Sequence, residues 1–119
     1  MGLFSFLFGD SSKESAEKAL GLTIAKDYLD FIGDSKIRRY GSELFLGIEG
    51  SKELSVVKAT LDERNNNPSF PSNMYVISPL GIDGILILQD SNGILYEYLP
   101  FSSPRKIYNN LQGYLNSIK

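Results

Sequence analysis

The sequence predicts a single α+β domain over residues 1–119, with a small mixed or antiparallel sheet flanked by N-terminal helices, a middle helix and a C-terminal helix. Three observations lead to this prediction. The chain of 119 residues is long enough for one hydrophobic core but not for two. Apolar residues recur with a helical period in some stretches and alternate as in strands in others. The predicted order is two helices, a strand pair, a helix, three strands and a helix.

Two helices are expected before the first strands. Residues 11–20 begin with Ser11 and carry Glu14 three residues later, which is the capping-box pattern of a helix start. Thr23 can cap a second helix, and Gly33 follows it where a left-handed C-terminal cap would lie. The apolar residues of this second helix fall at helical spacing: Ile24, Tyr28, Phe31 and Ile32.

A strand pair and a middle helix come next. Short strands are expected at residues 37–40 and 44–48, because β-forming residues flank a Gly-Ser turn. Residues 51–67 then return to a helical pattern, which ends before Pro68 because proline cannot continue a helix. One face of this helix is predicted to be buried, through Leu54, Val57 and Leu61.

The last third of the chain predicts three strands and a helix. The strands are expected at residues 74–78, 85–89 and 94–98. The middle one is apolar on both alternating faces, which indicates a central strand covered on both sides. Ser103 and Pro104 are a favoured cap and first residue for the final helix. Its predicted buried stripe is Ile107, Leu111, Tyr114, Leu115 and Ile118.

Composition excludes several classes of function. The chain has no cysteine and no histidine, which removes disulfides, thiolate chemistry, Ser-His-Asp catalysis and most transition-metal sites. We therefore expect no metal and no cofactor. The formal net charge of -2 gives no reason to expect nucleic acid as a partner. Binding through surface shape and charge is favoured over catalysis.

The N-terminal segment 1–10, MGLFSFLFGD, is apolar and short. It lacks the charged start of a secretory signal, and Phe6 occupies the position where a myristoylation motif has serine or threonine. No stretch approaches the length of a membrane span, so we expect no stable membrane insertion and a cytoplasmic location. The segment either docks on the core of its own chain or makes a loose contact with a membrane or partner, through Leu3, Phe4, Phe6, Leu7 and Phe8.

The cluster Asp90-Ser91-Asn92-Gly93 invites a chemical interpretation. An EF-hand loop that began at Asp90 would need oxygen ligands where Ile94 and Phe101 stand. Asp83 and Asp90 lie at opposite ends of a predicted strand, on the order of 20 Å apart, which is too far for a paired acid and base. The cluster is instead typical of a type I turn with a glycine bulge between two strands.

A charge pattern suggests where a partner would bind. Between Arg64 and Arg105 the chain has acids but no basic residue, and tyrosine is frequent there. Tyrosine is enriched in protein interfaces, and a surface of one sign attracts a partner of the other. The alternative is that these acids only keep the sheet soluble and unpaired. The candidate contact residues are Asp83, Asp90, Tyr96, Glu97 and Tyr98, with Asn66 from the loop of Asn65 to Asn67.

The order of segments resembles the SUKH superfamily, the domains similar to a yeast regulator of cell-wall synthesis. Residues 22–33 are similar to a helix of that family, and residues 53–98 resemble its middle and end. The resemblance covers residues 22–118 and includes the closing segment KIYNNLQGYL. It is carried by Val56, Val57, Thr60, Leu61, Arg64, Pro68, Pro71, Gly81 to Gly84 and Leu95 to Tyr98.

The resemblance implies a non-catalytic α+β domain. Bacterial members of the superfamily are widely immunity proteins that neutralise a toxin made by the same cell, often a nuclease, including toxins exported by type VII (LXG) secretion. An acidic sheet bearing tyrosines would suit the basic surface of a nuclease. Two other hypotheses stay open: a regulatory scaffold with several protein clients, and a small hydrolase that uses two converging carboxylates.

Overall fold

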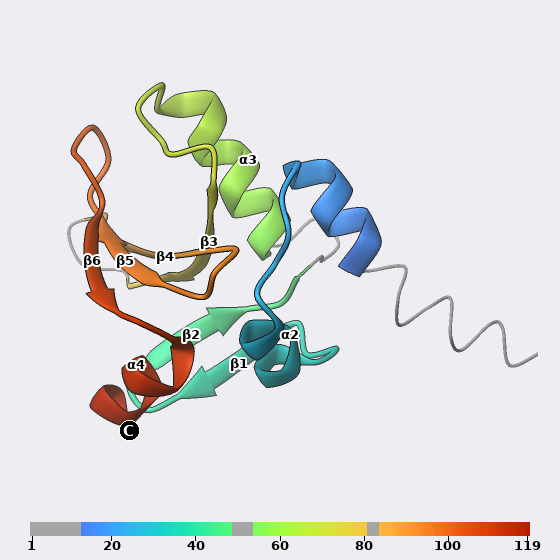
Figure 1. The fold of residues 1–119 in the computed structure, drawn as a ribbon, viewed down its shortest axis with the longest axis vertical. Coiled ribbons are helices and arrows are strands. Elements are labelled where there is room, and N and C mark those ends of the chain that lie inside the picture. The colour runs from blue at the N-terminus through green and yellow to red at the C-terminus, as the bar shows by residue number, and fades with distance from the viewer. Residues whose placement is uncertain (1–12, 49–53, 81–83) are drawn as a thin grey trace, which may run out of the picture.

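The computed structural model describes residues 13–48, 54–80 and 84–119, and these form the predicted α+β fold (Figure 1). The larger sheet is an antiparallel meander whose strands lie in chain order: β3 (Met74–Pro79), β4 (Leu86–Asp90), β5 (Leu95–Tyr98) and β6 (Arg105–Tyr108). A smaller antiparallel sheet contacts β3 through its second strand and consists of β1 (Ile37–Tyr40) and β2 (Glu43–Leu46). The central position predicted for β4 is confirmed.

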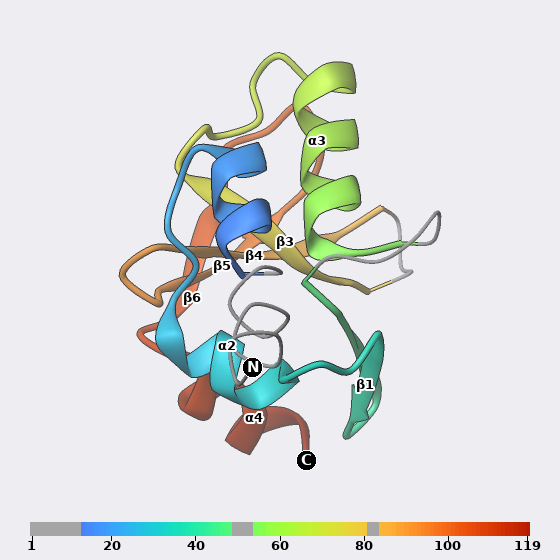
Figure 2. The same ribbon diagram turned by 90° about the vertical axis from the view of Figure 1, so that its right-hand side faces the viewer.

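The helices lie at two ends of the molecule. Figure 2 shows the helix of residues 13–20 beside α3 (Val56–Asn66), and α3 packs against β3. α2 (Lys26–Ile32) and α4 (Leu111–Ile118) pack together near the β1–β2 hairpin. The helices therefore cover both the meander and the hairpin.

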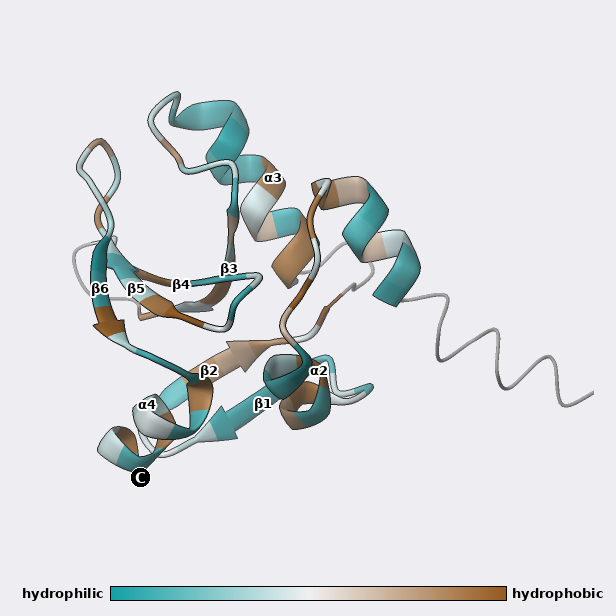
Figure 3. Ribbon diagram, viewed as in Figure 1, coloured by the Kyte–Doolittle hydropathy of each residue, from teal (hydrophilic) through white to brown (hydrophobic). Residues whose placement is uncertain are grey.

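Large apolar and aromatic side chains fill the space between these elements. Figure 3 shows brown segments on β3 and β4, whose sequences MYVISP and LILQD each contain three strongly hydrophobic residues. The rings of Phe31 and Phe45 meet edge to face, and so do those of Phe45 and Tyr114, which joins α2, β2 and α4. The largest fully buried side chains include Tyr28, Tyr75, Tyr98, Phe45, Ile24, Ile32, Leu46 and Ile77.

The N-terminal helices differ from the prediction only at their ends. In the first helix Ala16 and Leu20 are buried, while Ser11 lies outside the described residues. The second helix begins at Lys26 after Ala25, so Thr23 is not its cap. Gly33 ends this helix with a positive φ of 54°, and its N–H donates to the carbonyl of Leu29.

The predicted start of the last helix is wrong. Arg105 to Tyr108 form strand β6, which pairs with β5, although Ser103 and Pro104 are a good helix-start signal. The helix begins at Leu111, where the Asn110 side chain accepts a hydrogen bond from the Gly113 N–H at 2.9 Å. The extra strand changes the sheet, because it places two basic residues next to β5.

The buried face predicted for the middle helix is confirmed only at Val57, which is half-buried against the core. α3 begins after Ser55, whose side chain accepts a hydrogen bond from the Lys58 N–H, and it buries Val56 and Thr60. The Thr60 hydroxyl accepts from the Val76 N–H of β3 at 2.9 Å, so a polar residue occupies the contact with the sheet. The leucines predicted to be buried, Leu54 and Leu61, are exposed.

Two buried tyrosines predict a loss of stability at alkaline pH. Burial raises the pKa of Tyr28, and nearby Tyr75 raises it further. Burial is likewise the main cause that raises the pKa of Tyr75. Because the folded-state pKa values exceed the unfolded value of about 10, this stabilisation is fully present below about pH 10 and is lost above it. Above about pH 10, each tyrosine that stays protonated in the folded state makes the unfolding free energy fall by about 1.4 kcal/mol more per pH unit.

Urea unfolding at a series of pH values from about 8 to about 11 measures this effect. The unfolding free energy is expected to stay level between about pH 8 and about pH 9 and to fall steeply above about pH 10. A Tyr28→Phe variant should be less stable at neutral pH but show a shallower alkaline fall. Equal slopes for the two proteins would contradict the assignment of this effect to Tyr28.

Candidate functional site: the β5–β6 surface

Asp90 holds the turn between β4 and β5. Its buried carboxylate accepts hydrogen bonds from the N–H groups of Asn92 at 2.9 Å and Ile94 at 3.1 Å, and from the Tyr96 hydroxyl at 2.9 Å. Gly93 has a φ of 90° and donates its N–H to the Asp90 carbonyl. The turn predicted from the sequence is confirmed, and the Asp90 side chain is a structural acceptor inside it.

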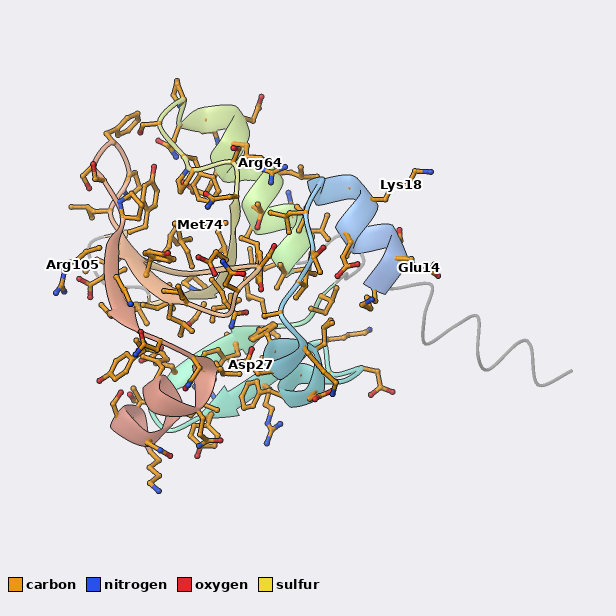
Figure 4. The ribbon with its side chains drawn as sticks, viewed as in Figure 1. Glu14, Lys18, Asp27, Arg64, Met74 and Arg105 are labelled. Atoms are coloured by element: carbon orange, nitrogen blue, oxygen red, sulfur yellow. The ribbon has the colours of Figure 1, made fainter. Side chains whose placement is uncertain are left out.

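A buried polar network continues from this turn into the helices. The Tyr75 hydroxyl accepts from the Ala25 N–H at 2.8 Å and donates to the Gln89 side chain at 2.7 Å. The Gln89 amide in turn donates to Asp27 at 3.0 Å. Asp27 also accepts from the Leu111 N–H at 3.1 Å and lies between α2 and α4 (Figure 4). The network joins β3, β4, α2 and α4, and the half-buried Asp27 carboxylate serves in it as a hydrogen-bond acceptor.

Tyr98 is a core residue. Its side chain is 0% exposed, and its ring packs edge to face on Phe70 with centroids 5.3 Å apart. The Tyr98 hydroxyl has no hydrogen-bond partner among the described residues. Tyr98 is therefore not available for direct contact with a partner. Asp83, another predicted contact residue, lies outside the described residues.

Glu97 and Tyr96 lie on the half-buried part of β5, beside the basic residues of β6. The Glu97 carboxylate pairs with the Arg105 guanidinium at 2.7 Å, and Tyr96 is aligned with Lys106 across the two strands. Figure 4 shows Arg105 at the outer side of β6. The prediction that this part of the sheet carries acids without bases is wrong, because the residues expected to start a helix form a neighbouring strand.

The loop between β5 and β6 exposes two apolar side chains. Leu99 is 47% exposed and Phe101 is 73% exposed. Phe101 has a φ of 69°, and it is the one residue other than glycine with a positive φ in the described part of the chain. Ser102 fixes the turn, because its N–H and its hydroxyl both donate to the Leu99 carbonyl. An aromatic ring held outward on a strained backbone is typical of a binding loop.

A shallow groove adjoins this loop. It has a volume of about 240 Å³ and is lined by Ile85, Glu97, Leu99, Ser102, Ser103 and Arg105. We define the β5–β6 surface as Glu97, Leu99, Phe101 and Arg105. Apolar residues at its centre and an ion pair at its side match the usual anatomy of a protein interface.

The loop between α3 and β3 lies at the same end of the molecule. Figures 1 and 2 both show the two loops at this end, and the contact of Phe70 with Tyr98 joins their bases. Asn65 and Asn66, predicted to lie in a loop, are exposed at the end of α3, while Asn67 is buried after it and its side chain donates to Glu63. The structure therefore places Asn66 at the same end as the β5–β6 surface.

Sequence reasoning missed Leu99 and Phe101. A signal was present, because the stretch LPFSSP places Leu99 directly before Pro100 and Phe101 between Pro100 and Pro104. Apolar residues in such a turn have no strand face to bury them.

No model of a protein family, no curated protein and no solved structure matches this chain. Each helix in the described ranges is too short or too polar to cross a lipid bilayer. The same residues contain no group of three or more acids that could hold a metal ion.

Proposed function

We propose that this chain is a non-catalytic immunity protein, an antitoxin that binds and neutralises a toxin made by the same cell, in the cytoplasm. The observation that carries the proposal is Phe101, a large aromatic side chain exposed on a strained loop beside Leu99. Aromatic residues supply much of the binding energy in protein interfaces. The resemblance to the SUKH immunity proteins supports a toxin as the partner. The proposal includes no cofactor, no nucleic acid and no membrane insertion.

The charges around Phe101 favour a partner with a basic surface. Glu97 is half-buried and pairs with Arg105, whose side chain is largely exposed. Such a surface ion pair contributes little to stability, so a basic group of the partner can replace Arg105 at low energetic cost. Tyr96 points to the opposite face of β5 and donates its hydroxyl to Asp90, so the charge at this surface comes from Glu97. A basic toxin domain, such as a nuclease, would place a cation near Glu97 and an apolar pocket over Phe101.

The hydrogen bonds of Asp27, which is half-buried, and of Asp90, which is buried, support a binding protein over a carboxylate hydrolase. Asp27 and Asp90 each accept two or more hydrogen bonds from groups that hold the fold together. A general acid or base needs a carboxyl that can exchange a proton with a substrate. Both carboxylates are committed to structural contacts instead.

A regulatory scaffold with several clients is the alternative function. It is favoured by two further exposed apolar residues, Leu54 just before α3 and Leu61 on α3. Two separate apolar surfaces would let one domain contact more than one protein.

Affinity capture of the tagged chain from the cells that make it, followed by mass spectrometry, separates these functions. Immunity predicts one stoichiometric partner with a basic domain, retained at high salt through its apolar contact with Phe101. The scaffold predicts several unrelated partners in low amounts. If no protein is captured, either in stoichiometric or in lower amounts, both proposals are contradicted.

A further inference from the structure

β1 is an edge strand. No described residue forms a backbone hydrogen bond to β1 on the side away from β2. It pairs with β2 on one side, with Ile37 opposite Leu46 and Arg39 opposite Leu44. In an antiparallel pair, successive residues alternate between forming both hydrogen bonds to the partner strand and forming none. The residues of β1 that form none turn their N–H and C=O groups to the open edge.

Three hydrogen bonds fix which residues these are. The Gly47 N–H donates to the Lys36 carbonyl, so the residues at 36 and 47 form a bonded pair. The carbonyls of Leu44 and Leu46 instead accept from Ser78 and Tyr28, on the side away from β1. Ile37 and Arg39, opposite these two leucines, are therefore the residues whose backbone groups point to the open edge.

Most side chains along this edge are exposed, and three of them, Lys36, Arg38 and Arg39, are basic. Ile37 is 52% exposed, and Figure 3 colours most of β1 as hydrophilic. Arg38 is occupied, because its guanidinium lies 4.2 Å from the centre of the Phe31 ring and donates to the Phe31 carbonyl. Lys36 and Arg39 are exposed and form no ion pair with any described residue.

We propose that β1 binds an extended acidic segment of a partner protein, which adds to the β1–β2 sheet as a third strand. Main-chain hydrogen bonds to Ile37 and Arg39 would hold the segment. Lys36 and Arg39 lie on opposite faces of the strand, so carboxylates on one face of the segment would lie near one of these two bases, which outnumber the exposed acid Asp34 beside them. A second copy of this chain fits less well, because two β1 strands side by side bring arginines together.

This inference goes beyond the proposed function and does not depend on it. β1 lies at the end of the molecule opposite the β5–β6 loop in both Figure 1 and Figure 2. The two surfaces also differ in character, since one presents an aromatic side chain and the other a basic strand edge.

Amide hydrogen exchange measured by NMR tests the proposal with an eight-residue peptide of alternating aspartate and valine. At a peptide concentration ten times the dissociation constant, exchange of the Ile37 and Arg39 amides is expected to slow about tenfold. The Arg38 and Tyr40 amides should change much less, because they already bond to β2. Slowing of all four amides alike, or of none at millimolar peptide, would overturn the proposal.

Two variants and a second peptide complete the test. Ile37→Pro removes an N–H that faces the open edge, so the β1–β2 pairing should persist while peptide binding falls at least tenfold. Arg39→Glu keeps every backbone group. It should also weaken binding of the acidic peptide and strengthen binding of a peptide of alternating lysine and valine. Equal binding of the acidic and basic peptides by the wild-type chain would refute the charge argument, whatever the behaviour of the proline variant.

Discussion

Replacing Tyr75 with phenylalanine is expected to lower the free energy of unfolding by about 2–3 kcal/mol. The Tyr75 hydroxyl bonds the Ala25 N–H and the Gln89 side chain, and all three residues are buried. Its removal leaves one buried donor and one buried acceptor without a partner, and each such group carries a desolvation penalty. The loss should also loosen the contact of α2 with the β4–β5 turn.

Tyr98→Phe is the matched control, because the same atom is removed from an equally buried ring. The Tyr98 hydroxyl has no partner among the described residues, so its loss should leave stability unchanged or raise it by up to about 1 kcal/mol. Urea unfolding of the two variants and the wild-type chain compares the three free energies directly. A Tyr98→Phe variant as destabilised as Tyr75→Phe would show that Tyr98 is bonded in solution.

Phe101→Gly is expected to weaken binding of the cognate partner about 30-fold, which corresponds to about 2 kcal/mol. The same change should leave the fold intact or raise its unfolding free energy by about 1 kcal/mol, because glycine adopts a positive φ without strain. Phe101 is 73% exposed, so no core contact is lost. Weaker partner binding together with a higher unfolding free energy would identify Phe101 as a residue retained for function and not for stability.

Titration calorimetry with the captured partner and urea unfolding of the free chain measure the two effects. Leu61→Ala is the matched control, since Leu61 is also an exposed apolar residue, at 40%, but lies on α3. It should leave affinity for the captured partner unchanged. A weaker complex with Leu61→Ala and an unaffected complex with Phe101→Gly would move the interface to α3.

Much of the fold was predictable from local patterns. Strand β3 begins at Met74 and β5 ends at Tyr98, as alternation and turn residues indicate. The Asp90 to Gly93 turn was also predictable, because its residue types favour that geometry in any context. These features are determined by residues that are adjacent in the chain, so one sequence is enough to predict them.

The errors came from contacts between distant segments. Pro104 favours a helix locally, but the residues after it gain more from pairing with β5. Thr60 is polar, yet it is buried because its hydroxyl caps an N–H of β3. The partner-binding prediction failed for Tyr98 for the same reason, since Phe70 covers its ring from another loop.

The growth of cells that express the captured partner, with and without this chain, tests immunity most directly. The partner alone should stop growth, and co-expression of the wild-type chain should restore it. The Phe101→Gly chain should restore growth only at higher expression, because its complex is weaker. A partner that is harmless by itself, or a growth arrest that the wild-type chain does not relieve, would contradict the proposal that this protein is an antitoxin.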